Sequence, residues 1–167
     1  FSPQPMQWIA IGRRPDTSEI EELRGAGVHF ALFDPFSDEE LRFVVNEAHH
    51  AGAPELLRIE QRVPTLIRAR VTTKTGERVA VVSNLSTPGA YLATPRPAMR
   101  GGTLRMQIPL DAGDVETQAL VMWNNVPGNL RRANIPVGMG VRFTDQSVET
   151  TTALERYIAE RAKAYWL

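Results

Sequence analysis

The chain has 167 residues, of which 43% are hydrophobic and 23% charged, and its formal net charge is zero. This composition excludes a wholly disordered or collagen-like chain, and no apolar run approaches the roughly 20 residues of a membrane helix. The absence of cysteine excludes disulfides and thiolate metal sites. We expect a cytoplasmic protein without a metal or cofactor. Because it opens with Phe-Ser-Pro-Gln-Pro, we also expect a segment of a longer parent protein.

Charge is distributed unevenly along the sequence. Residues 1–53 carry four arginines against nine acidic residues, a net charge of −5, whereas residues 54–167 carry 15 basic and ten acidic residues, a net charge of +5. The basic residues are nearly all arginine, whose planar guanidinium suits phosphates and guanine edges. The second half could therefore bind an anionic partner in spite of the neutral total.

Residues 1–53 alternate strand and helix signals. Short apolar runs at 7–11 and 28–33 predict buried strands. Asp16 or Thr17 is expected to cap a helix that runs to about Gly25. Ser37 is expected to cap a second helix that ends at residues 49–52, with Glu40 completing a capping box. This order of elements predicts a parallel α/β unit.

After Pro54 the pattern changes to short strands separated by glycine, proline and turn residues. The expected strands are 66–73, 78–85, 90–94, 103–110, 115–125 and 137–143. Such a series predicts a small closed antiparallel barrel. From Asp145 a helical period returns, and Leu154, Tyr157, Ile158 and Ala162 line one face of a helix that we expect to reach the C-terminus.

Two motifs in the barrel half carry a family resemblance. Arg58-Ile59-Glu60-Gln61-Arg62 has the form RxxxR, and Asn84-Leu85-Ser86-Thr87-Pro88-Gly89 has the form (D/N)xSxxG. In this order and at this spacing, the two motifs resemble the signature of PilZ domains, bacterial receptors for cyclic di-GMP. The resemblance covers residues 54–167 and implies a mainly β fold, a six-stranded antiparallel barrel with a C-terminal helix.

The resemblance also implies the ligand contacts: Arg58, Arg62, Asn84, Ser86 and Gly89. Arginine forks can hold phosphates and the O6/N7 edge of guanine, and amide and hydroxyl groups can meet the remaining polar edges. Glycine permits a turn and a close approach of the ligand. In the family, a hydrophobic residue before the first arginine accompanies a single bound ligand, so Leu57 favours one molecule.

Residues 1–53 resemble the last two strand–helix units of a response-regulator receiver domain, a flavodoxin-like fold. Two departures stand out: Asp34 replaces the usual lysine before Pro35, and Gly12 replaces the usual Ser or Thr. The resemblance therefore implies a truncated or degenerate receiver (a pseudo-receiver) without phosphorylation chemistry, in domain 1–53, ahead of the PilZ domain at 54–167.

Other candidates have plainer explanations. His49 and His50 are adjacent on a helix and cannot easily face one metal, so we expect solvated histidines. Trp123 is expected to pack on the barrel or against a helix. Arg131 and Arg132 are expected to be solvated loop charges.

We therefore predict a signalling protein that is not an enzyme. It would bind cyclic di-GMP and relay the level of this second messenger by conformational change and contact with a downstream protein. The alternative is a degenerate PilZ adaptor that binds no nucleotide and scaffolds a motility or polarity complex. We expect no membrane insertion, and no recognition helix for nucleic acid stands out.

Overall fold

The computed structural model describes residues 6–51, 60–128 and 134–167. The chain divides into two compact units, one formed by Phe1–Ile59 with Glu160–Leu167 and the other by Glu60–Ala159. The division differs from a cut at residue 53, because the last eight residues group with the N-terminal unit rather than with the barrel.

The N-terminal unit has the predicted order of strand, helix, strand, helix. Its elements are β1 (Ile9–Gly12), α1 (Thr17–Gly25), β2 (Phe30–Phe33) and α2 (Asp38–Ala51). The two strands pair in parallel, as predicted. Both expected caps are present, with Asp16 and Glu19 forming one capping box and Ser37 and Glu40 the other.

The end of the chain completes the core of this unit. The α3 helix (Val148–Ala162) stops short of the C-terminus, so the expectation that it reaches the end is wrong. Beyond it, Trp166 forms an antiparallel bridge with Phe30. Tyr165 is buried with Phe30, Phe43 and other apolar residues. Burial of these aromatic rings explains why the backbone leaves the helix and follows β2.

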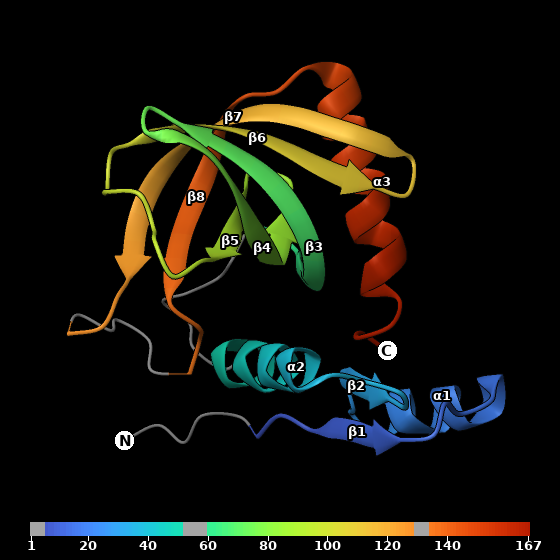
Figure 1. Ribbon diagram of the computed structural model, residues 1–167. Helices are drawn as coiled ribbons and strands as arrows, with labels where there is room; N and C mark the ends of the chain where they lie inside the picture. Colours follow the sequence, from blue (N-terminus) through green and yellow to red (C-terminus); the bar gives the residue numbers. More distant parts are fainter. Residues whose placement is uncertain (1–5, 52–59, 129–133) are drawn as a thin grey trace. The chain divides into compact units, whose positions relative to one another are not determined.

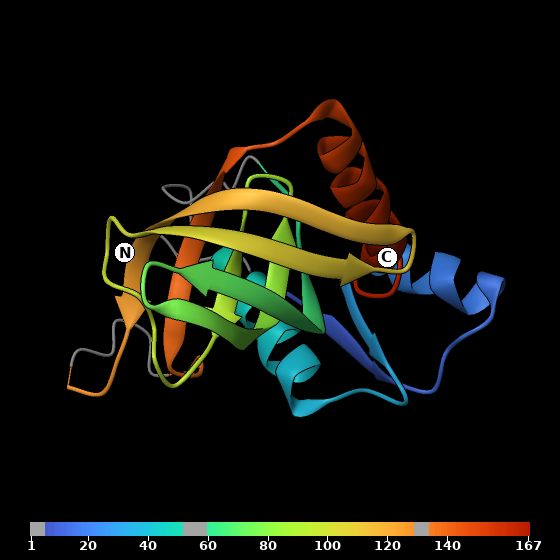
Figure 2. The same cartoon turned by 45° about the horizontal axis from the view of Figure 1, so that its top comes forward.

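The second unit is a closed six-stranded barrel, which confirms the predicted architecture (Figure 1). Its strands are β3 (Arg62–Thr73), β4 (Gly76–Ser86), β5 (Gly89–Ala93), β6 (Thr103–Leu110), β7 (Gly113–Asn125) and β8 (Gly138–Asp145). The order around the barrel is β3-β4-β5-β8-β7-β6, with every pair antiparallel. Figure 2 shows the β6–β7 hairpin in front, beside β3 and β4.

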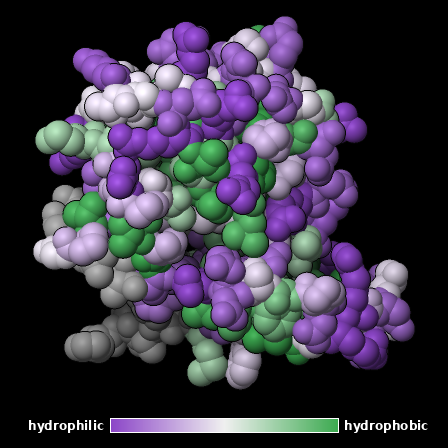
Figure 3. All heavy atoms as spheres, viewed as in Figure 1, coloured by the Kyte–Doolittle hydropathy of each residue, from purple (hydrophilic) through white to green (hydrophobic). Residues whose placement is uncertain are grey.

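Side chains alternate along the strands between the interior of the barrel and its outer surface, and the interior ones form the core. Along β6, Leu104, Met106 and Ile108 are buried, and Arg105 between them is exposed. The outer surface is mixed, and Figure 3 shows hydrophobic residues in small groups among hydrophilic ones. The closed sheet removes the open edges that would otherwise pair with other chains.

The helix that follows the barrel begins where the sequence predicts. Ser147 caps α3 through its Oγ, which accepts a hydrogen bond from the Thr150 N–H at 3.2 Å. Leu154, Ile158 and Ala162 of the expected stripe are buried. Within the described residues, no helix is long and apolar enough to cross a membrane.

Candidate functional site

The structure places four of the five candidate residues on three neighbouring strands. Arg62 opens β3, Asn84 and Ser86 lie near the end of β4, and Gly89 opens β5. Arg58 lies outside the described residues, so its position is still a prediction. In Figure 1 the three strands lie side by side, together with β8.

Strand register sorts the site into two cross-strand rows, which we call the arginine row and the aromatic row. The arginine row pairs Arg62 with Ser86, Ser86 with Gly89, and Gly89 with Arg142 of β8. The aromatic row, one step along the strands, consists of Pro64, Asn84, Tyr91, Gly140 and Trp123. The two rows carry two arginines and no carboxylate, which favours an anionic ligand.

Asn84 carries an unsatisfied acceptor. Its Oδ1 is buried and accepts no hydrogen bond in the part of the chain that the structure describes. A buried acceptor without a donor costs roughly 1–3 kcal/mol. Such a cost is a reason to look for a donor that arrives with a ligand, since buried polar groups are otherwise paired.

Ser86 already has a structural task. Its Oγ donates a hydrogen bond to the Gly89 carbonyl at 3.0 Å, closing the two-residue turn between β4 and β5. Further bonds hold this turn, from Gln146 Nε2 to the Thr87 carbonyl and from the Phe143 N–H to the Pro88 carbonyl, each at 2.8 Å. The hydroxyl keeps its acceptor lone pairs, but the side chain is only 1% exposed. A ligand would reach it only after a local movement.

Gly89 is required by the barrel itself. A Cβ at this position would lie 2.3 Å from the Val141 carbonyl oxygen of β8, which is far inside van der Waals contact. Its φ is not in the left-handed region. The expected reasons for this glycine were a turn and room for a ligand, whereas the structure supplies a third, the close approach of the β5 and β8 backbones.

Tyr91 and Trp123 give the aromatic row its name. Their rings stack with centroids 5.3 Å apart, and the Trp123 indole covers Gly140, where a Cβ would lie 2.1 Å from its Nε1. Trp123 thus packs on the barrel, which is one of the two predicted arrangements. Burial raises the pKa of Tyr91 to about 12, although a hydrogen bond with Asn125 acts in the opposite direction. Its hydroxyl donates to the Pro136 carbonyl at 2.5 Å.

Sequence reasoning did not select Arg142 as a site residue. Gly138-Met139-Gly140-Val141-Arg142-Phe143 reads as a barrel strand, and its alternation puts Gly138, Gly140 and Arg142 on one face. That pattern was available from the sequence. The pairing of β8 with β5, which brings Arg142 beside Gly89, depends on contacts distant in the chain.

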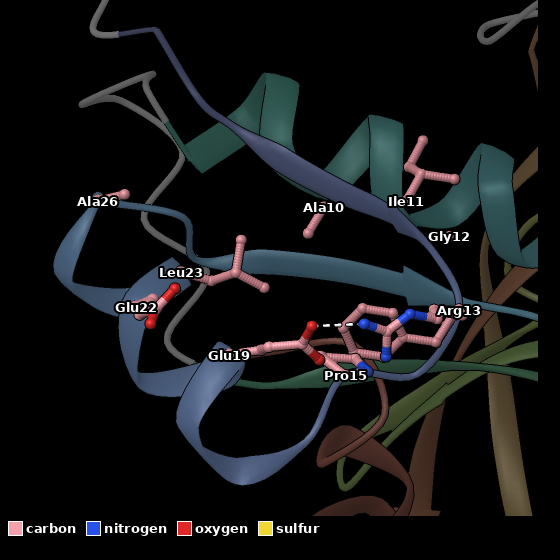
Figure 4. A pocket seen from close by; sticks show the side chains of 10 residues that line it. Ala10, Ile11, Gly12, Arg13, Pro15, Glu19, Glu22, Leu23 and Ala26 are labelled. Atoms are coloured by element: carbon pink, nitrogen blue, oxygen red, sulfur yellow. Dashed lines mark hydrogen bonds and ion pairs between the residues drawn. The ribbon is translucent and has the colours of Figure 1, made fainter.

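The remaining candidates do not add to the site. His49 is exposed on α2, and no group of three or more potential metal ligands occurs among the described residues. Arg131 and Arg132 lie outside the described residues. The N-terminal unit has an open hollow of about 610 Å³ beside α1, and Figure 4 shows the ion pair of Arg13 with Glu19 at its rim. Its lining combines apolar residues such as Ala10 and Leu23 with the charged Glu22.

Residues 56–160 match the model of the PilZ domain family, and the match covers more than half of the chain. The chain therefore belongs to the PilZ domain family, as its two motifs predicted. Proteins of this family bind cyclic di-GMP (c-di-GMP), a ligand rather than a cofactor. A search of curated proteins found no match.

Solved structures share the fold. The structure of Bacillus subtilis Inhibitor of motility (MotI/DgrA) matches with a TM-score of 0.54 and 18% identity over 65% of this chain and 52% of that one. The PilZ domain of Escherichia coli YcgR with c-di-GMP matches with a TM-score of 0.50 and 18% identity, over 65% of this chain and 93% of that one. The K. pneumonia MrkH–c-di-GMP complex matches with a TM-score of 0.51 and 12% identity, over 63% of this chain and 52% of that one. The chain spans about half the length of MotI/DgrA and of MrkH.

The family match begins at residue 56 and gives no support to the receiver resemblance of residues 1–53. The structure there is a small unit with two parallel strands and two helices. That arrangement agrees with the predicted elements and is common to many α/β folds.

Proposed function

We propose that this chain is a c-di-GMP receptor whose ligand binds across the ends of β3, β4 and β5. Arg62 supplies a fork for phosphate or guanine, and we assign the same role to Arg58 four residues earlier. Asn84 meets the polar edge of a guanine, and Ser86 a phosphate or guanine oxygen after a local movement. Leu57 favours one bound molecule. The role is that of a receptor in the cytoplasm and not of an enzyme.

The unsatisfied Oδ1 of Asn84 carries the proposal. It lies one row from Arg62, and guanine offers N–H donors that would satisfy it. The PilZ domain of YcgR and MrkH share the fold of this chain, and both structures contain c-di-GMP, which supports the ligand class.

Binding becomes a signal through movement. Ser86 is buried, so a ligand that contacts it must displace neighbouring chain. A ligand shifts such an equilibrium only by its differential affinity for the two states. We propose that the resulting change is passed to a downstream protein by direct contact. MotI/DgrA is described as an inhibitor of motility, which makes motility one candidate process.

A degenerate adaptor is the second candidate. Ser86 and Gly89 have structural tasks at the β4–β5 turn, so this part of the motif could persist in a barrel that binds no nucleotide. Such a protein would use the same fold to scaffold a motility or polarity complex. The receiver resemblance adds a related proposal, that residues 1–53 take no phosphate from acetyl phosphate.

Calorimetric titration with c-di-GMP separates the two candidates. The parent chain should bind, and Arg58→Ala, Arg62→Ala and Asn84→Ala should each bind roughly tenfold more weakly or worse. Arg68→Ala is the matched control, since Arg68 is exposed on β3 away from the two rows, and its affinity should stay within about twofold.

Stability measurements show whether Asn84→Ala weakens binding directly or by destabilising the fold. Because its buried Oδ1 has no partner among the described residues, Asn84→Ala should change the free energy of unfolding by less than about 1 kcal/mol while binding is lost. Binding that is unchanged in all three variants would refute this site. A parent chain that gives no heat with c-di-GMP would favour the adaptor.

A further inference from the structure

Arg142 completes the arginine row from the side opposite to Arg62. It lies on β8 between the buried residues Val141 and Phe143, and its own side chain is exposed. Its backbone pairs with Gly89 of the (D/N)xSxxG motif. An arginine that neither family motif includes therefore stands next to the last residue of one of them.

The guanidinium of Arg142 is available to bind an anion. Its side chain has no hydrogen bond or ion pair with any described residue. By contrast, Arg70 pairs with Glu77 and Arg161 with Glu40. Because the arginine row contains no carboxylate, Arg142 can bind an anion without losing an ion pair.

The distance between the two arginines suits a small ligand that spans the row. Arg62 and Arg142 are separated by three strand spacings, or about 14 Å. Gly89, between Ser86 and Arg142, has no side chain and can tolerate none. Gly140, two residues from Arg142 along β8, lies under the Trp123 indole.

We infer that Arg142 is a further ligand-binding residue, which holds a phosphate of c-di-GMP at the end of the site opposite to Arg62. The inference rests on the proposed function. Cyclic di-GMP carries two phosphates, so arginines on two sides of the ligand can contact both. Arg58 and Arg62 supply one side from the start of β3, and Arg142 supplies the other from β8.

Calorimetry with c-di-GMP on three variants tests the inference. Arg142→Gln should weaken binding roughly tenfold or more, because a charge-assisted contact is lost. Arg142→Lys keeps the charge but not the fork, and should recover part of the affinity. Arg105→Gln is the control, since Arg105 is an exposed barrel arginine on β6 without an ion pair in the described part of the chain. It should bind within about twofold of the parent.

Each outcome decides something separate. If the parent and Arg105→Gln bind, Arg62→Ala does not, and Arg142→Gln binds like the parent, the Arg142 inference is overturned and the proposed function stands. If Arg142→Gln and Arg105→Gln lose equal affinity, the effect is one of general charge, and the specific contact is again overturned. If the parent chain does not bind at all, the proposed function and this inference fail together.

Discussion

At the scale of single residues, the motif glycine shows how a signature position can serve the fold before it serves a ligand. Gly89 sits where the β5 and β8 backbones approach too closely for any side chain. A ligand contact at this position would be additional to that requirement. The same holds for Ser86, whose hydroxyl closes the preceding turn.

Gly89→Ala should therefore destabilise the barrel even without ligand. A Cβ at 2.3 Å from the Val141 carbonyl oxygen must force β5 and β8 apart, at a cost of roughly 1–3 kcal/mol. Urea unfolding followed by circular dichroism measures the change. Gly25→Ala is the control, because a Cβ there meets nothing within 4 Å and alanine favours the end of α1. Equal stability of Gly89→Ala and the parent would contradict the close approach.

Tyr91 predicts a specific alkaline transition. Burial raises its pKa in the folded chain to about 12, above the ordinary value of 10.0. The stability that protonated Tyr91 gives the folded chain is fully present below its unfolded pKa and is lost as pH rises through its folded pKa. Between these two values only the unfolded chain loses the tyrosine proton. The free energy of unfolding should fall between about pH 10 and 12 in the parent.

Tyr91→Phe is the matched variant. It keeps the stacking on Trp123 and removes the ionisable hydroxyl together with its bond to the Pro136 carbonyl. It should begin less stable near neutral pH and lose less on going to alkaline pH. Parallel profiles for the two proteins would show that Tyr91 does not titrate as its burial requires.

At the scale of elements, the C-terminal segment depends on one carboxylate. Glu40 of α2 accepts hydrogen bonds from the Tyr165 hydroxyl and, at 3.3 Å, from the Arg161 guanidinium. Burial raises the pKa of Glu40, but the bonds from Tyr165 and Ser37 and the nearby Arg161 charge together lower it. The segment should thus be held best when Glu40 is ionised.

The stability that ionised Glu40 provides should be lost in acid. Because the folded pKa lies below the unfolded value, this stabilisation is present above about pH 4.5 and is lost as pH falls through the folded pKa. Tyr165→Phe keeps the ring against Phe43 but loses the hydroxyl, and should cost about 1 kcal/mol or more near neutral pH. Its acid dependence should be shallower than that of the parent.

Amide exchange reports this segment locally. The Ala31 N–H donates to the Tyr165 carbonyl at 2.9 Å, and the Leu167 N–H donates to the His29 carbonyl at 3.1 Å. Both amides should exchange faster in Tyr165→Phe than in the parent at one pH. Unchanged exchange at both would show that Glu40 does not hold the end of the chain.

The elements were predictable where the pattern is local. Thr103–Leu110 alternates cleanly, and β6 has those bounds. The start of β3 was missed, because Pro64 argues against a strand; in the structure Pro64 pairs with Asn84 and a bulge follows it before Ile67. The course of the chain after Ala162 was also missed, since helical periodicity does not reveal which core will take Tyr165 and Trp166.

At the scale of the whole molecule, the sequence predicted the family and the barrel because motif order, spacing and strand count agree. It did not predict the row that joins Arg62 to Arg142. That row depends on the pairing of β5 with β8, strands separated in sequence by β6 and β7. Long-range pairing is the part of a β fold that local patterns specify least.

Hydrogen exchange of the parent chain with and without saturating c-di-GMP tests the central claim most directly, because it reports both binding and its place. The account predicts protection at residues 56–63 and 84–89 and in β8 around Arg142, with the distant β6–β7 turn unchanged. Exchange that is the same with and without the ligand, or protection confined to other parts of the chain, would contradict it.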